Sequence, residues 1–102
     1  ANVNFETSNK RNELVNKTSA AVSAFNSYEA QQQLYSNNVR NYEQLWQSEK
    51  RLFDTGESSL FMINSREMSY INAQLKLNEI KNKNNKSALE VAYSFGLLGL
   101  GN

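Results

Sequence analysis

The side chains with the most chemical potential in this chain are carboxylates, because the sequence contains neither histidine nor cysteine. Histidine is the commonest general base and metal ligand, and cysteine supplies the reactive thiolate. The carboxylates Glu43, Glu49, Asp54 and Glu57 would need a pocket in which they converge, and a rod of two helices offers none. The sequence therefore predicts no catalytic site, no metal site and no cofactor, and the protein is not expected to be an enzyme.

The charges are balanced rather than gathered on one face. Charged residues make up 21% of the chain, and the formal net charge is +1. The densest basic stretch holds Lys81, Lys83 and Lys86 among the asparagines of residues 82–85. We interpret this stretch as a helix face in water, and we expect no nucleic-acid partner.

Helix breakers are confined to one internal position and to the C-terminal end. Proline is absent, and glycine occurs only at positions 56, 96, 99 and 101. Two helices are therefore predicted, over about residues 2–54 and 59–96, with a tip turn at 54–59. A turn this short makes its helices antiparallel neighbours, so residues 1–102 form one all-α unit, a long antiparallel helical hairpin. Gly96 and the residues after it are expected to stop the second helix.

The first predicted helix carries an apolar seam with a heptad repeat, which is typical of a coiled coil. Its aromatic members, including Trp46, Tyr35 and Tyr42, are predicted to pack in the seam rather than to form a ligand cage. Large aromatic residues favour looser packing, as in a multi-helix wall. The seam positions are Leu14, Thr18, Ala21, Phe25, Tyr28, Gln32, Tyr35, Val39, Tyr42, Trp46, Glu49 and Phe53.

The second predicted helix has two adjacent apolar rows, which indicates neighbours on both sides. One row consists of Leu60, Met68, Ile71, Leu75, Leu89 and Ala92. The other row consists of Ile63, Tyr70, Leu77, Ile80, Val91 and Phe95.

The turn has residues suited to ending one helix and starting another. Gly56 can adopt the left-handed conformation that ends a helix. Ser58 or Ser59 can cap the next helix, and Glu57 lies where the helix dipole favours a negative charge. The large apolar residues that flank the turn are expected to close its base: Phe53, Leu60 and Phe61.

Three stretches together resemble the TolC-like outer-membrane efflux protein family. They are residues 51–61 (RLFDTGESSLF), residues 64–67 (NSRE) and residues 73–77 (AQLKL). The closing segment from Ala88 to Gly96 is also similar to that family. Members are about four times longer, with two helix–strand repeats, and this chain is similar to the last long hairpin. We therefore interpret it as a fragment or a processed chain, without a visible signal peptide or transmembrane segment.

The resemblance implies a homotrimeric channel in the outer membrane of a Gram-negative cell, with this hairpin in the wall of a periplasmic α-barrel. The turn would dock a periplasmic adaptor, and through it an inner-membrane transporter, and would gate the pore. It also implies that Arg66 holds the closed tip through interhelical bonds; an ordinary surface pair with Glu67 or Tyr70 is the alternative. The implied docking and gating residues are Asp54, Thr55, Gly56, Glu57, Ser58, Ser59 and Leu60.

The chain departs from the family at the pore constriction. Some members carry acidic residues six and nine positions after the turn glycine, where this chain has Met62 and Ser65. The expected acidic ring is absent, so the sequence does not predict whether the pore would select cations. Asp54, Glu57 or Glu67 are alternative sources of negative charge.

Two other classes of protein contain long helical hairpins. The periplasmic adaptor of the same export systems has an Arg-Leu pattern beside its turn. Arg51-Leu52 matches only a small part of that pattern. A coiled-coil scaffold would have leucine-rich seams and more charge pairs beside them.

Overall fold

The computed structural model describes residues 2–99, and side chains from Thr7 onward, as two long helices and no strand. Helix α1 spans Asn2–Asp54 and helix α2 spans Leu60–Leu98. Both run this far because no proline interrupts them and Gly56 is the first glycine. Over the same residues, neither helix has an apolar stretch long enough to cross a membrane.

The end of α2 depends on which glycine leaves the helical conformation. Gly96 stays helical, and α2 continues to Leu98, two residues past the predicted end. Gly99 adopts a φ of +76°, and its N–H donates to the Gly96 carbonyl at 3.1 Å. Gly99 therefore ends the helix by the left-handed conformation that glycine favours. Of the residues after Gly96 that were expected to stop the helix, 100–102 lie outside the described part of the chain.

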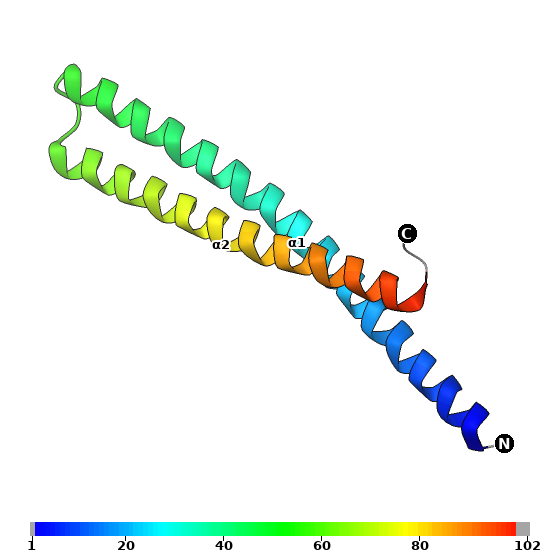
Figure 1. The fold of residues 1–102 in the computed structure, drawn as a ribbon. Coiled ribbons are helices and arrows are strands. Elements are labelled where there is room, and N and C mark those ends of the chain that lie inside the picture. Colours follow the sequence, from blue (N-terminus) through cyan, green and yellow to red (C-terminus); the bar gives the residue numbers. More distant parts are fainter. Residues whose placement is uncertain (1, 100–102) are drawn as a thin grey trace. The chain divides into compact units, whose positions relative to one another are not determined.

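The chain divides into two compact units. The tip unit comprises residues 30–81, which are the second part of α1, the turn and the first part of α2. The terminal unit comprises residues 1–29 and 82–102. In Figure 1 the tip unit holds the turn that joins the two helices, drawn in green.

Within the tip unit, α1 and α2 form an antiparallel helical hairpin. The predicted row of Ile63, Tyr70, Leu77 and Ile80 is the face of α2 that packs on α1. Leu77 and Ile80 are the buried apolar residues among the described side chains. The ring of Tyr70 stacks on Trp46 of α1, with ring centroids 5.4 Å apart and an angle of 27° between the planes.

The other predicted row of α2 is not covered by a helix in the described part of the chain. Within the tip unit its members Leu60, Met68, Ile71 and Leu75 are exposed, and Phe61 beside them is 78% exposed. Phe61, Met68 and Leu75 are seven residues apart, so they follow one line along the helix, away from the row that packs on α1. This exposed line on α2 thus has the heptad spacing of a coiled-coil seam, but no helix of the described chain packs against it.

Helix α1 also has an exposed apolar strip in the tip unit. Leu34, Leu45 and Leu52 are exposed, and they lie beside the seam that faces α2 rather than on it. Their spacings of eleven and seven residues keep them on one face of the helix. Each arm of the tip hairpin therefore has one apolar face in contact with the other arm and a second one open.

The terminal unit has a polar interior. The most buried of its described side chains are Thr18, Asn84 and Ser87. Asn84 donates from Nδ2 to Glu29 Oε1 at 2.7 Å, across the two helices. The prediction that the whole of 82–85 faces water was wrong at Asn84, because its amide pairs with a carboxylate on α1. Lys81, Lys83 and Lys86 are exposed.

Candidate docking tip

The backbone at the end of α1 forms a Schellman motif around Gly56, which has a φ of +80°. The Glu57 N–H donates to the Leu52 carbonyl at 2.8 Å, and the Gly56 N–H donates to the Phe53 carbonyl at 3.0 Å. A Cβ at position 56 would meet no atom within 4 Å. Glycine is therefore favoured here by the positive φ, and not by a shortage of space within the hairpin.

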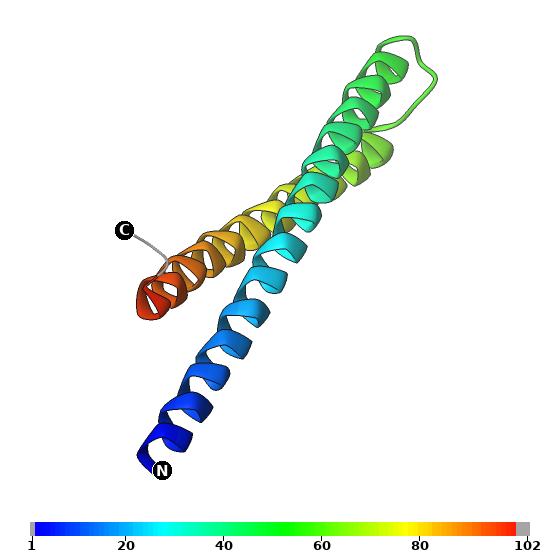
Figure 2. The same cartoon turned by 90° about the vertical axis from the view of Figure 1, so that its right-hand side faces the viewer.

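The start of α2 is capped by Ser59. Its Oγ accepts a hydrogen bond from the Met62 N–H at 3.2 Å, and its carbonyl accepts one from the Ile63 N–H at 3.1 Å. These contacts make Ser59 the N-cap residue of α2. The sequence left Ser58 and Ser59 open as caps, and the structure assigns the role to Ser59. Figure 2 shows the irregular connection that results between the two helix ends.

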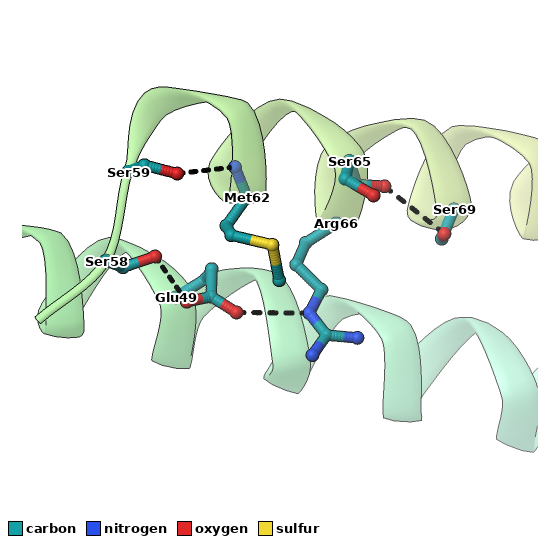
Figure 3. Close-up of polar contacts among 7 residues, drawn as sticks. All are labelled: Glu49, Ser58, Ser59, Met62, Ser65, Arg66 and Ser69. Atoms are coloured by element: carbon teal, nitrogen blue, oxygen red, sulfur yellow. Dashed lines mark hydrogen bonds and ion pairs between the residues drawn. The ribbon is translucent and has the colours of Figure 1, made fainter.

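Ser58 has a different partner, a carboxylate on α1. Its hydroxyl donates to Glu49 Oε2 at 2.5 Å, and Arg66 Nε donates to Glu49 Oε1 at 3.2 Å (Figure 3). Glu49 is 8% exposed, although it carries a charge. One carboxylate therefore joins α1, the turn and α2, using both of its oxygens.

The environment of Glu49 favours its charged form. The hydrogen bond from Ser58 and then the one from Arg66 lower the pKa of Glu49, and the positive charge of Arg66 adds to this. Burial acts in the opposite direction, but the pKa stays below its ordinary value of 4.5. Glu49 is therefore ionised at neutral pH while it is enclosed between the helices.

Arg66 bonds across the hairpin rather than along its own helix. The predicted alternative was a surface pair with Glu67 or Tyr70, but Arg66 instead forms a 3.2 Å ion pair with Glu49. The guanidinium comes from α2 and the carboxylate from α1 (Figure 3). Arg66 thus makes an interhelical bond within this hairpin.

The apolar residues at the tip do not close the base of the turn. Phe53, Leu60 and Phe61 are all exposed, so the prediction that they pack together there was wrong. The Schellman motif and the Ser59 cap hold the turn by hydrogen bonds, which leaves these side chains facing outward. The remaining predicted tip residues Asp54, Thr55 and Glu57 are also exposed.

The two positions that carry acidic residues in some family members differ in orientation. Both residues are exposed, but the Met62 side chain points toward α1 in Figure 3. The Ser65 carbonyl accepts a hydrogen bond from the Ser69 hydroxyl at 3.2 Å. Of the three alternative acids, Asp54 and Glu57 are exposed and Glu67 is half-buried. Within the described residues, no three carboxylates gather in a group that could hold a metal ion.

The aromatic residues of α1 lie along the hairpin contact. Trp46 stacks on Tyr70, and Lys50 Nζ lies 3.5 Å from the centroid of the Trp46 ring. The Trp46 Nε1 atom is buried without a hydrogen-bond partner among the described residues. Tyr35 and Tyr42 line an open groove of about 390 Å³ beside the seam. Trp46 does not line this groove, and it packs on Tyr70 in the seam as predicted. Tyr42 is 38% exposed, so it is only partly covered by the hairpin contact.

The residue that sequence reasoning missed at the tip is Glu49. It was placed in the seam and judged to lack a convergent pocket, but it was not paired with Arg66. A signal was present in the sequence, since Glu49 and Arg66 lie at nearly equal distances from the middle of the turn, eight and nine residues from Glu57. In an antiparallel hairpin, residues at equal distances from the turn face each other, so two opposite charges there predict a bond.

No family model, curated protein or solved structure matches the chain.

Proposed function

We propose that this chain is the periplasmic hairpin of a trimeric outer-membrane efflux or secretion channel. Its helices would form part of an α-helical tunnel wall, and its turn would dock a periplasmic adaptor and gate the pore. The proposal combines the sequence resemblance of residues 51–77 with the surface that the hairpin leaves open.

The observation that carries the proposal is the second apolar face on each arm of the tip unit. Phe61, Met68 and Leu75 on α2 are exposed at heptad spacing, and Leu45 and Leu52 on α1 are exposed at the same spacing. An isolated two-helix hairpin leaves such apolar rows exposed to water, whereas a wall of helices gives every helix a neighbour on either side that can cover them. The two open faces are what a wall segment requires.

The tip supports the docking part of the proposal. Its backbone is fixed by the Schellman motif and the Ser59 cap, so that Leu60 and Phe61 are held outward rather than folded inward. Open space around Gly56 leaves room for the close approach of a partner backbone. Exposed apolar side chains on a preformed turn suit a protein contact better than contact with water.

The proposal is tested by separating assembly from coupling in the exporting cell. Leu45→Lys with Met68→Lys charges both open faces and is expected to abolish the trimer, measured by cross-linking at a single introduced cysteine, since the chain has none of its own. Gly56→Arg is expected to leave the trimer intact and to abolish export of a toxic dye. Lys76→Gln, on an exposed position outside both faces, is the control.

Two outcomes would contradict the proposal. Wild-type export from Gly56→Arg would remove the docking role of the turn. A trimer that survives both lysine substitutions would show that these faces do not form a tunnel wall.

A further inference from the structure

One carboxylate is the meeting point of the three segments that make the tip. Glu49 bonds to Ser58 in the turn, nine residues away, and to Arg66 on α2, seventeen residues away (Figure 3). The other tip contacts are local, because each joins residues no more than five positions apart. The contacts of Glu49 therefore tie the turn and both helices together.

Ser58 is available for this bond because its neighbour performs the capping. The Ser59 hydroxyl accepts the Met62 N–H as the cap of α2, and the Ser58 hydroxyl donates to Glu49 on α1 instead. The turn therefore has two kinds of anchor. The Schellman motif and the cap fix its ends, and the bond from Ser58 to Glu49 fixes its middle against the first helix.

We propose that Glu49 is a positioning residue whose ionised carboxylate holds the turn in its docking conformation, and that protonation of this carboxylate releases the turn. The conformational part concerns this hairpin alone. Its consequence for adaptor docking rests on the function proposed above.

Among the charged groups near Glu49, Arg66 is the one that contacts its carboxylate. Arg66 faces it from α2, and Glu57 in the turn is exposed. Lys50, its neighbour on α1, lies over the Trp46 ring instead. The hydrogen bonds from Ser58 and Arg66 lower the pKa of Glu49, so the contact stabilises the hairpin above about pH 4.5 and is lost as the pH falls through the lower pKa of the folded state.

The test compares Glu49→Gln with Glu43→Gln in the 102-residue chain. Glu43 is an exposed carboxylate on the same helix, so its variant removes the same charge without touching the tip. At pH 7, Glu49→Gln is expected to raise the hydrogen-exchange rates of the Gly56 and Glu57 amides several-fold, whereas Glu43→Gln leaves them unchanged. Circular dichroism verifies that all variants retain their helices.

The pH profile separates control by ionisation from a merely structural role. Backbone order in residues 55–59, measured by ¹⁵N relaxation, is expected to fall in the wild type below about pH 4.5 and to be low and pH-independent in Glu49→Gln. Ser58→Ala is the second variant, because it loosens the turn while the ion pair with Arg66 remains. An ordered turn in Glu49→Gln at pH 7, or the same acid transition in both proteins, would overturn the proposal.

The two proposals fail separately. The relaxation measurements need neither export nor a partner, so they stand even if the chain is not part of a channel. If they succeed and Glu49→Gln exports as well as Glu43→Gln does, Glu49 still orders the turn, and the link between turn order and docking is wrong.

Discussion

The two units of this chain use the same helices but bury different chemistry. In the tip unit, Leu77 and Ile80 are buried, the rings of Trp46 and Tyr70 stack across the hairpin, and the buried charge of Glu49 has partners. In the terminal unit, the most buried described side chains are polar, and apolar residues such as Val15 line an open groove instead. The tip unit is therefore packed as a small core, and the terminal unit is not.

The two units are therefore expected to differ in how much stability their own helix contact provides. Burying apolar area is the main stabilising term in folding, while burying polar groups is at best nearly neutral once their water contacts are lost. The contact in the tip unit should then hold the helices together by itself. The contact in the terminal unit should depend more on neighbours that cover the groove lined by Val15, Val22, Phe95 and Leu98.

The largest expected effect comes from emptying the core of the tip unit. Ile80 is 3% exposed, and Ile80→Ala is expected to lower the free energy of unfolding by about 2 kcal/mol, through lost burial and a cavity. Leu75→Ala on the open row, where the side chain is 63% exposed, is the control and should change it by less than about 0.5 kcal/mol. Urea denaturation followed by circular dichroism measures both. Equal losses would mean that the row assigned to the helix contact is not the one that stabilises the hairpin.

How far the sequence predicted this fold depends on the kind of signal. Both helices followed from the absence of proline and from the place of Gly56, because a single breaker in a long helical pattern is unambiguous. The two rows of α2 were also visible as spacings. Which of them faces α1 was not, because both rows are apolar and only the geometry of the pair distinguishes them.

The candidate site was predicted less completely than the fold. Gly56 followed from local chemistry, since few other residues tolerate a positive φ. The choice between Ser58 and Ser59 did not, because either hydroxyl could cap and only the distance to Glu49 decides. The outward position of Phe53, Leu60 and Phe61 was missed, since apolar residues beside a turn usually pack and here hydrogen bonds close the turn without them.

The next effect compares a glycine in each unit, with opposite signs expected. Gly56 has a φ of +80°, so Gly56→Ala is expected to destabilise the hairpin by about 1 kcal/mol. Gly96 is helical and a Cβ there would meet no atom within 4 Å, so Gly96→Ala should stabilise by about 1 kcal/mol. Urea unfolding of both variants gives the signs directly. A loss of stability in Gly96→Ala would contradict the helical conformation of that residue.

The smallest effect examines the polar interior of the terminal unit at Ser87. This side chain is 3% exposed, and its Oγ has no hydrogen-bond partner in the described part of the chain. Ser87→Ala removes a buried hydroxyl and improves helix propensity, so it should stabilise by roughly 0.5–1 kcal/mol. Ser69→Ala on the same helix is the matched control in the tip unit, because the Ser69 hydroxyl is bonded to the Ser65 carbonyl and less buried. Hydrogen exchange should slow in residues 82–98 for Ser87→Ala and stay unchanged for Ser69→Ala. If Ser87→Ala destabilises the terminal unit instead, its hydroxyl has a partner, such as an enclosed water, and the polar interior there holds the helices together rather than weakening their contact.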